Sequence, residues 1–464
     1  MSVRDRVKKI LDRLKSLLRE NPHLQRIFRD TSYLFSSNTL NMVLGVIQSS
    51  LSATLLGVYN FGLLGIITAS ASTVNNLFSF RMSEIIVKYL GDFLEEKDYD
   101  RAGALIKVAA LVEFTFALLA FIFIWWISPI LAQHLAKDPS MQSIFVFYGT
   151  IILANGFYET SYGVVQVLGR FRGQAIINSV QSIVTAILIV ITFITKGGLD
   201  MIVFSYLVGK IILGIGPVFL AIDGLNRRIG KSWWRVPIST LPNWRELIRF
   251  SLGANLSATI NMVVRDSELL WISYFLSPAE AGYYKVAIAI NRYILLPINP
   301  FIQTTFPEIN RRIKNKAWPE LQKFLRQISS ISLVWTVAAG FGLVIFGEWV
   351  IQIYADPEFS PAYPAMLVLL IGYGLANIFF WNRSLLLSFG DSTFAFLSMF
   401  VAGFLKIAGA FWLVPKYGFL AEASLFSLFF VVSVSMNLLR GRFRIREGKK
   451  KSKETASEIE VGVT

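Results

Sequence analysis

Long apolar blocks separated by short charged stretches constrain this sequence more than any other feature. A helix needs roughly 20 apolar residues to cross about 30 Å of hydrocarbon, and such blocks recur along most of the 464 residues. Only 16% of the residues are charged, against about 25% in an ordinary soluble chain. We expect an all-α membrane protein with about twelve transmembrane helices. The predicted spans are residues 31–56, 61–90, 104–127, 143–168, 173–195, 199–222, 247–276, 280–306, 324–347, 362–389, 391–414 and 418–439.

The positions of the cations predict the orientation of these spans. If the spans alternate in direction, 35 of the 45 Lys and Arg residues fall on one side, and only Lys137, Lys196, Lys285 and Lys416 fall on the other. Cytoplasmic loops are the ones enriched in Lys and Arg, so both termini are predicted to be cytoplasmic in a cell (inner) membrane. The net charge of +15 then lies mostly in cytoplasmic loops, next to anionic lipid headgroups. This placement of the cations argues against a nucleic-acid partner.

The two ends of the chain are basic. Apolar residues recur at helical spacing in residues 3–18 with cations between them, which predicts an interfacial amphipathic helix that lies on anionic lipids. A partner-binding coiled coil is the alternative for this segment. The stretch after Arg440 is expected to be a disordered basic anchor. No cleavable signal sequence is expected at the start.

The sequence also contains an internal repeat. The segment Leu56–Gly62 matches Leu276–Gly282. Gly198 matches Gly418 at the same offset along the chain, and Asn38 matches Asn255 at nearly the same one. Two six-span halves in the same orientation follow, related by an axis along the membrane normal, as in transporters that bind substrate between the halves. A duplicated scaffold without transport is the alternative.

The repeat sets the predicted domain boundaries. We expect an interfacial helix at 1–30, an N-terminal lobe at 31–225, a cytoplasmic linker at 226–246, a C-terminal lobe at 247–440 and a basic cytoplasmic tail at 441–464. Within the eighth span, Pro297 and Pro300 should kink the helix, since each proline removes a backbone hydrogen bond.

Six cations lie well inside the predicted spans and not near their ends, where a charge at the centre costs ~2.5–3.5 kcal/mol. They should therefore face a water-filled cavity or pair with one of the acids in the spans. Arg81 and Arg265 are each followed three positions later by a glutamate, Glu84 and Glu268, so an ion pair along the helix and substrate binding are both open. The remaining four are Arg292, Arg383, Lys406 and Lys210, and none has an acid that close in sequence. A lysine such as Lys406 can also extend its ammonium group to the membrane surface.

These charges suit an anionic substrate and a coupling ion. A guanidinium binds phosphate through a planar fork and stays protonated. The candidate substrate-binding residues are Arg81, Arg265, Arg292, Arg383 and Lys406. Carboxyls that bind H⁺ or Na⁺ are the candidates for coupling, although contacts between helices are an equal alternative. These are Glu113, Glu159, Asp266, Glu268 and Glu422.

Other chemistry has little support in the sequence. The chain has no cysteine and two histidines, which argues against a catalytic thiol or a zinc site. No glycine-rich phosphate loop precedes a Lys-Ser/Thr pair, so we expect no ATP-driven pump, no metal and no cofactor. The longest external loops are short, at 128–142 and 348–361, which argues against a membrane enzyme.

The run Asp30–Asn38, followed by Leu55–Leu63, Ser83–Leu90 and Lys97–Ala102, together with Ala281–Tyr284 in the second repeat, resembles a known family. It is similar to the polysaccharide (O-antigen-type) flippases of the multidrug/oligosaccharidyl-lipid/polysaccharide (MOP) exporter superfamily, over residues 28–440. The resemblance implies two six-helix lobes in a V around a central cavity. It also implies movement of undecaprenyl-pyrophosphate-linked oligosaccharide to the outer leaflet by alternating access. The lipid II flippase branch has two further spans, where this sequence has its charged segment after Arg440.

Three other functions remain alternatives. A cation-coupled multidrug exporter of the same fold would use the acids in the spans. A polymerase or ligase of polysaccharide assembly would transfer sugars. A scaffold would recruit polysaccharide-assembly enzymes through its basic N-terminal helix.

Overall fold

The computed structural model describes residues 22–79, 81–240 and 267–461, and every regular element in these ranges is helical. The chain divides into two compact units. Unit 1 takes the described residues of 1–55, 74–127 and 144–256, and unit 2 takes those of 56–73, 128–143 and 257–464. The two short segments of unit 2 precede the predicted linker in sequence. The predicted lobe boundaries themselves stay a prediction.

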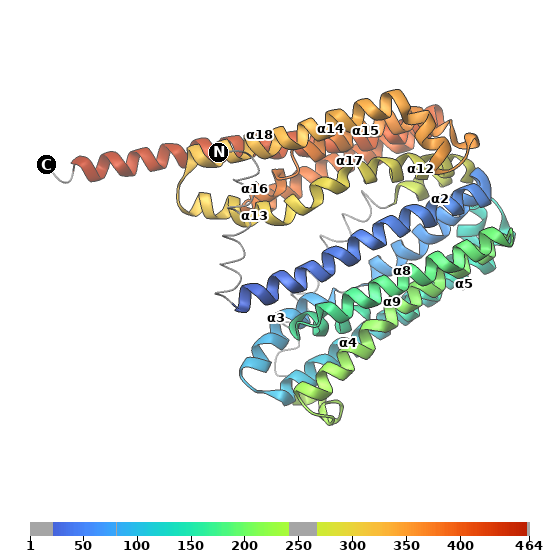
Figure 1. The fold of residues 1–464 in the computed structure, drawn as a ribbon, viewed down its shortest axis with the longest axis horizontal. Helices are drawn as coiled ribbons and strands as arrows, with labels where there is room; N and C mark the ends of the chain where they lie inside the picture. Colours follow the sequence, from blue (N-terminus) through green and yellow to red (C-terminus); the bar gives the residue numbers. More distant parts are fainter. Residues whose placement is uncertain (1–21, 80, 241–266, 462–464) are drawn as a thin grey trace, which may run out of the picture. The chain divides into compact units, whose positions relative to one another are not determined.

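The helices follow the apolar blocks (Figure 1). The first half of the chain contains α2 (Pro22–Phe78), α3 (Met82–Glu95), α4 (Tyr99–His134), η1 (Pro139–Met141), α5 (Gln142–Gly149), α6 (Ile151–Ala154), α7 (Tyr158–Val167), α8 (Phe171–Ile194), α9 (Leu199–Arg228), η2 (Trp233–Arg235) and η3 (Ile238–Thr240). The second half contains α11 (Glu268–Phe275), α12 (Pro278–Leu295), η4 (Leu296–Ile298), α13 (Asn299–Lys314), α14 (Trp318–Tyr354), η5 (Pro357–Phe359), α15 (Ala362–Ile378), α16 (Asn382–Ser388), α17 (Ser392–Tyr417) and α18 (Phe419–Val461).

Nine stretches of the described chain are long and apolar enough to cross a membrane, which makes this a multi-pass membrane protein. The first stretch, Ser36–Phe78, covers most of the first predicted span and more than half of the second, joined through a non-helical Gly57 at φ 65°. Most of the seventh predicted span lies outside the described residues. The eighth is broken at the 3-10 turn η4, where the kink was predicted. The predicted class, an all-α bundle of about twelve spans, is thus confirmed.

Two details differ from the prediction. The second span does not continue to residue 90, because α2 ends at Phe78 and α3 begins after Arg81, whose backbone is left-handed at φ 47°. The segment after Arg440 is helical and continues α18 to Val461. It packs along the start of α14, where the indole nitrogen of Trp318 donates a 2.8 Å hydrogen bond to the hydroxyl oxygen of Ser452.

Unit 1 is held by an apolar core and by a few internal hydrogen bonds. Ile86, Leu90, Leu105, Val164 and Leu225 form part of one buried cluster among α3, α4, α7 and α9. The amide of Gln48 on α2 donates 2.8 Å to the carbonyl oxygen of Ser182 on α8. Such bonds hold helices together where lipid offers no hydrogen bonds.

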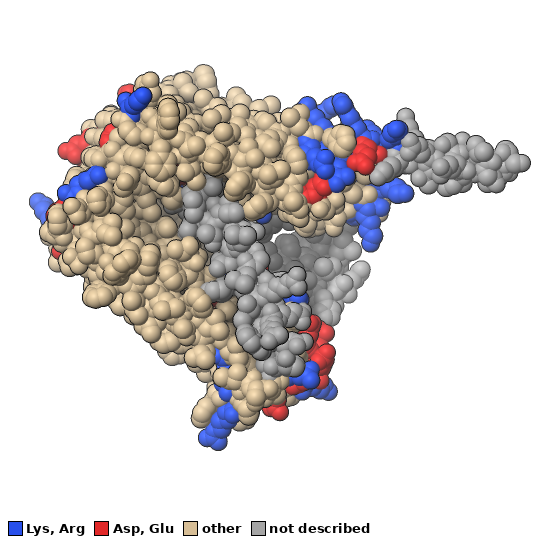
Figure 2. Space-filling view, turned by 180° about the vertical axis from the view of Figure 1, so that it is seen from behind, with Lys and Arg blue, Asp and Glu red and all other residues tan. Residues whose placement is uncertain are grey.

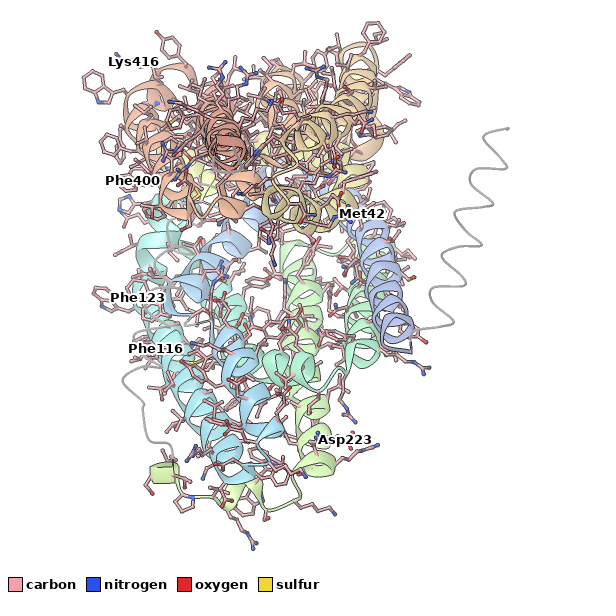
Figure 3. All side chains as sticks on the ribbon, turned by 90° about the vertical axis from the view of Figure 1, so that its left-hand side faces the viewer. Met42, Phe116, Phe123, Asp223, Phe400 and Lys416 are labelled. Carbon is pink, nitrogen blue, oxygen red and sulfur yellow. The ribbon has the colours of Figure 1, made fainter. Side chains whose placement is uncertain are left out.

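Unit 2 packs α15 against α14, α12 and α18, and α17 against α18 (Figure 1). The amide of Asn377 on α15 donates 2.8 Å to Thr336 on α14, and that of Asn291 on α12 donates 3.0 Å to the carbonyl oxygen of Met366. Apolar side chains cover the outside, among them Phe400 on α17, which points outward in Figure 3 and is 48% exposed. The broad uncharged surface in Figure 2 is what a protein embedded in lipid presents.

The internal repeat is visible as a close crossing of backbones within unit 2. A Cβ atom on Gly62 would overlap the carbonyl oxygen of Pro278, and a Cβ atom on Gly282 would overlap that of Val58. Gly62 and Gly282 are the two glycines that the repeat matches. Each is required because the matched helix of the other repeat passes directly over it.

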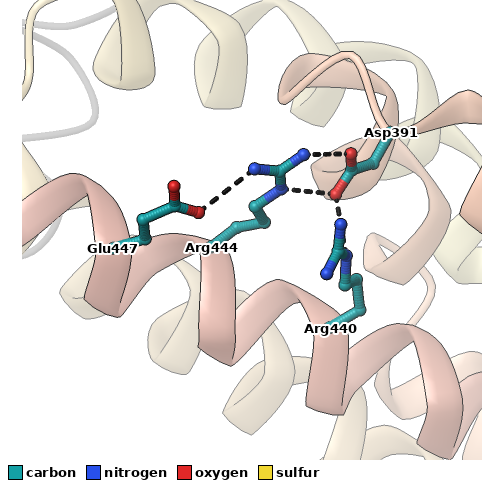
Figure 4. A network of polar contacts seen from close by, with 4 residues as sticks. All are labelled: Asp391, Arg440, Arg444 and Glu447. Atoms are coloured by element: carbon teal, nitrogen blue, oxygen red, sulfur yellow. Dashed lines mark hydrogen bonds and ion pairs between the residues drawn. The ribbon is translucent and has the colours of Figure 1, made fainter.

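A second pair of matched positions carries ion pairs of opposite polarity. In unit 1, Arg170 Nη2 lies 2.6 Å from Asp223 Oδ2. The residues at the equivalent positions of the second repeat are Asp391 and Arg444, which also form an ion pair in unit 2 (Figure 4). The hydrogen bonds that Arg444 and Arg440 donate lower the pKa of the Asp391 carboxyl. In both units the pair ties the sixth helix of the repeat to the loop after the fourth.

The glycine crossing generates the first prediction. Gly62→Ala should destabilise the protein by at least the ~1–3 kcal/mol typical of overpacking, because backbone rather than a side chain occupies the space. Gly342→Ala on α14 is the control, since a Cβ there meets nothing within 4 Å. Thermal unfolding in detergent measures both, and equal melting temperatures would contradict the crossing.

Candidate functional site

A cavity of about 450 Å³ with both polar and apolar side chains in its lining lies in unit 2 beside a break in a membrane span. Helix α15 ends at Ile378, and α16 starts at Asn382 after Phe379 leaves the helical conformation at φ −110°, ψ 37°. A break of this kind at membrane depth is tolerated where it lines a cavity. The cavity is lined by Ile302, Tyr373, Ala376, Asn377, Phe380, Asn382, Arg383, Leu387, Ser392, Ala395, Phe396, Ser398, Met399, Phe429, Phe430, Ser433, Val434 and Asn437.

Amide side chains organise the polar wall of this cavity. The amide nitrogen of Asn437 on α18 donates 2.7 Å to the Oδ1 of Asn382, at the start of α16. The Oδ1 of Asn437 accepts a 2.7 Å hydrogen bond from the hydroxyl of the fully buried Ser398 on α17. This chain of hydrogen bonds fixes α16, α17 and α18 around the break.

Arg383 is the one cation among the described residues that line this cavity. It follows Asn382 on α16 and its side chain is exposed. Within the described ranges no carboxylate forms an ion pair with its guanidinium. The site therefore combines a positive charge, amides and aromatic rings, a set that fits an anionic group attached to a polar, hydroxyl-rich molecule.

A second cluster in unit 2 is fully buried. Lys406 Nζ on α17 lies 3.2 Å from Glu268 Oε1, at the start of α11, and 3.2 Å from Glu422 Oε1, in the first turn of α18. The side chains of the three residues are at most 3% exposed. The ammonium also lies 4.8 Å from the centre of the Phe426 ring.

The hydrogen bonding of this buried cluster is incomplete. Among the described atoms, neither carboxylate oxygen of Glu422 accepts a well-aligned hydrogen bond besides its ion pair with Lys406, and the hydroxyl of the fully buried Tyr284 lacks a partner. Two carboxylates face one ammonium, so these three residues carry an excess negative charge when both carboxyls are ionised, and the exposed Arg292 also acts electrostatically on Glu268. Burying an unbalanced charge is costly, so a proton or a bound cation would stabilise the cluster.

Unit 1 contains two of the predicted coupling acids. The carboxylate of Glu113 on α4 accepts hydrogen bonds from the backbone nitrogens of Glu159, at 2.7 Å, and Thr160, at 2.9 Å. It thus caps α7, which starts after the break that follows α6. The hydroxyl of Ser83 donates to the Glu159 carboxylate. Because anions stabilise a helix N-terminus, Glu113 has a structural role here.

The other predicted residues are spread over the fold. Arg81 forms an ion pair with Glu84 at 3.2 Å, and both side chains are about half exposed, at 48% and 45%. Arg292 lies on α12 and is exposed. Lys210 on α9 is exposed as well. Arg265 and Asp266 lie outside the described residues. The structure therefore brings Lys406, Glu268 and Glu422 together and leaves Arg383 separate from them.

Sequence reasoning missed the partners of Lys406 and the amide chain. Lys406 has no acid close to it in sequence, but Glu268 and Glu422, which belong to two other helices, meet it in space. The sequence did indicate that such ion pairs could form, because the predicted spans contain both cations and acids. For Asn382, Asn437 and Ser398 nothing in the sequence distinguishes them from other polar residues.

The long apolar helices, two of them broken, define a multi-pass helical membrane protein with charges buried inside it. The chain belongs to a family described as polysaccharide biosynthesis protein, whose model matches residues 27–312, more than half of its length. The predicted resemblance to this family is thus confirmed. A comparison with curated proteins gave no match.

Solved structures show the same fold. A multidrug resistance MATE family transporter of the MOP superfamily, in an inward-facing conformation, superposes with a TM-score of 0.71 at 12% identity, covering 89% of this chain and 96% of the other. The lipid II flippase MurJ, in an inward closed conformation, gives 0.65 at 14% identity over 88% and 87%. A MOP transporter from Pyrococcus furiosus, described as having a binding pocket of reverse polarity, gives 0.55 at 14% identity over 91% and 95%. All three of these structures are described as transporters or as a flippase.

The buried cluster generates the second prediction. Lys406→Met should destabilise the protein by about 3–5 kcal/mol, the cost of leaving one side of a buried ion pair uncompensated. Lowering the pH should restore part of that stability, since protonation of Glu268 or Glu422 removes their repulsion. Thermal unfolding as a function of pH measures this.

Lys416→Met is the matched control, because Lys416 is an exposed lysine near the end of the same helix. Combining Lys406→Met with Glu268→Gln and Glu422→Gln should recover most of the stability. A Lys406→Met protein as stable as the Lys416→Met control would show that the three charges do not interact.

Proposed function

We propose that this protein is a flippase that moves undecaprenyl-pyrophosphate-linked oligosaccharide from the cytoplasmic to the outer leaflet by alternating access. The polysaccharide-biosynthesis family and the fold shared with a lipid II flippase support this proposal. The observation that carries it is the cavity at the break between α15 and α16, where a guanidinium without an ion-pair partner among the described residues stands beside amides.

Each part of that cavity suits a part of the proposed cargo. Arg383 would bind a phosphate through charge-assisted hydrogen bonds, which are about twice as strong as neutral ones. Asn382 and Asn437 would exchange hydrogen bonds with sugar hydroxyls, and the rings of Tyr373 and Phe430 would supply apolar faces. Arg81, Arg265 and Arg292 are proposed as further cationic contacts along the path. Lys406 does not line the cavity, and we assign it to the buried cluster rather than to the substrate.

The buried cluster is the proposed coupling site. A proton or Na⁺ that joins Glu268, Lys406 and Glu422 would cancel their excess negative charge. Because these residues lie on α11, α17 and α18, gain or loss of that ion would change how tightly the three helices pack. Glu113, Glu159 and Asp266 are kept as secondary candidates for coupling.

The membrane setting of the proposal follows from the charges. Both termini are proposed to be cytoplasmic in the cell (inner) membrane, with lobes at 31–225 and 247–440, and anionic lipids would contact the basic segments. Polysaccharide-assembly enzymes are proposed partners. Alternating access requires two states with different affinity for the cargo on each side of the membrane.

A second candidate is a cation-coupled multidrug exporter. The excess of carboxylates in the buried cluster favours it, since buried acids attract cationic compounds, and a multidrug transporter shares the fold. The cationic Arg383 in the larger cavity favours the flippase instead. The two functions differ in the charge of the cargo, which is anionic for the flippase and cationic for the exporter.

The third prediction tests the cargo. Arg383→Ala should reduce flipping of a fluorescent polyprenyl-pyrophosphate oligosaccharide in proteoliposomes about tenfold or more, the loss expected for one hydrogen bond to a charged group. Arg292→Ala should also reduce it. Arg383→Lys should retain part of the activity because the charge remains.

Lys137→Ala is the control, because Lys137 is exposed and its ammonium donates to the carbonyl oxygen of Tyr274. All variants should reconstitute equally. Flipping that is the same in Arg383→Ala, Arg292→Ala and Lys137→Ala would remove the cationic site. Absence of flipping together with ion-driven uptake of a cationic dye would identify an exporter.

A further inference from the structure

We propose that a second, smaller cavity in unit 2 binds the phosphate of an anionic phospholipid from the surrounding membrane. This cavity of about 200 Å³ lies among α14, the α15–α16 break and α18. Its lining includes Arg326, Ser329, Trp381, Leu385 and Arg442. The proposal is independent of the flippase function, because it concerns a resident lipid rather than cargo.

The cavity joins two cations to an apolar floor. Arg326 comes from α14 and Arg442 from α18, and both side chains are exposed. The floor includes the buried Leu385 and Trp381. The indole nitrogen of Trp381 donates 2.7 Å to the Ser329 hydroxyl, so the indole is fixed by a bond inside the wall. A phosphate with attached carbon chains matches this combination better than a free ion does.

The two arginines differ from their neighbours in that no acid of the described residues pairs with them. Arg440 and Arg444 converge on Asp391, and Arg311 and Arg312 pair with Glu308 (Figure 4 for the first pair). Throughout the described ranges, by contrast, no carboxylate pairs with Arg326 or Arg442, and none lines the cavity. Two guanidinium groups that line one small cavity suit a phosphate, because its oxygens accept strong charge-assisted hydrogen bonds from arginine.

Each arginine stands at the end of a stripe of residues that faces lipid. On α14, the exposed Leu333, Val337 and Val344 all follow Arg326. They do so by about two, three and five turns of a helix with 3.6 residues per turn, so the four side chains share one face of the helix. Arg326 is therefore the residue where this lipid-facing stripe meets the charged end of the span.

The same holds on α18. The exposed Leu420 and Leu428 precede Arg442 by about six and four turns of the helix, and Leu439, 65% exposed, lies one turn before it. Lys and Arg residues gather on unit 2 around this end of α18 (Figure 2). The cavity thus opens where acyl chains give way to headgroups, and its volume is too small for a lipid-linked oligosaccharide.

The test compares lipid binding by two matched double variants of the full chain, Arg326→Ala/Arg442→Ala and Lys323→Ala/Arg446→Ala. Lys323 and Arg446 are exposed cations of the same two helices that do not line the cavity. Purified protein in detergent is titrated with phosphatidylglycerol, with phosphatidylcholine and with inorganic phosphate. The melting temperature and lipid-bound species in native mass spectrometry are the readouts.

We expect phosphatidylglycerol to raise the melting temperature of the wild type and of the Lys323/Arg446 variant, with the shift largely lost in the Arg326/Arg442 variant. Phosphatidylcholine and inorganic phosphate should give little shift. An equal phosphatidylglycerol shift in both variants would overturn the proposal, and a full shift with inorganic phosphate would assign the site to a free ion. If the Arg326/Arg442 variant does not fold, the single variants Arg326→Gln and Arg442→Gln are measured in the same assay. Each should then show a smaller phosphatidylglycerol shift than the wild type, and an unchanged shift in both would overturn the proposal. Flipping activity does not enter the measurement, so failure here is distinct from failure of the proposed function.

Discussion

Hydrocarbon offers no hydrogen bonds, and most of the polar structure described here follows from that one constraint. Where a span runs unbroken, the helix satisfies its own backbone. Where a span breaks, other groups must replace the missing bonds, and the two units do this differently. At the start of α7 the carboxylate of Glu113 binds two backbone nitrogens. At the equivalent break before α16, a neutral amide serves, because the side-chain nitrogen of Asn382 donates a 2.8 Å hydrogen bond to the carbonyl oxygen of Phe379. Asn437 in turn donates to the side-chain oxygen of Asn382. The break capped by an acid carries negative charge, whereas the break lined by amides is next to an arginine and a cavity.

The repeat shows how duplication leaves the framework intact while its charges diverge. Gly62 and Gly282 must both remain glycine, because each is covered by backbone from the other repeat. The ion pair Arg170–Asp223 and its counterpart Asp391–Arg444 exchange the positions of acid and base. Either arrangement gives the same attraction, so the polarity of such a pair is free to change, provided both members change together. Backbone contacts admit no such exchange, so glycine is kept at both of these matched positions.

Composition and pattern were sufficient for the fold but only partly for the sites. Apolar blocks, cation-rich loops and matched glycines predict spans, orientation and duplication, because each depends on local sequence. The break before α16 could not be predicted in this way, since no proline or glycine marks residues 379–381. The pairing of Lys406 with Glu268 and Glu422 depends on how three helices pack, and residue spacing carries no information on that. Arg383, which also lacks a nearby acid in sequence, has the opposite outcome and lines a cavity. The same sequence signal, an isolated cation in a span, therefore gives a buried ion pair in one case and a candidate binding residue in the other.

The break between α15 and α16 lies between the two cavities and contributes residues to both. Phe379, Trp381 and Leu385 line the smaller cavity, while Phe380, Asn382 and Arg383 line the larger one. The break thus turns alternate residues toward opposite sides of one short segment. A phospholipid held by Arg326 and Arg442 would pack against Trp381 and limit the movement of α16, and with it the position of Arg383. Binding of lipid at one face and of cargo at the other would then be linked through this segment, with each ligand changing the affinity for the other by the same factor. Anionic lipid in the membrane would in this way regulate the cationic cavity without contacting the cargo.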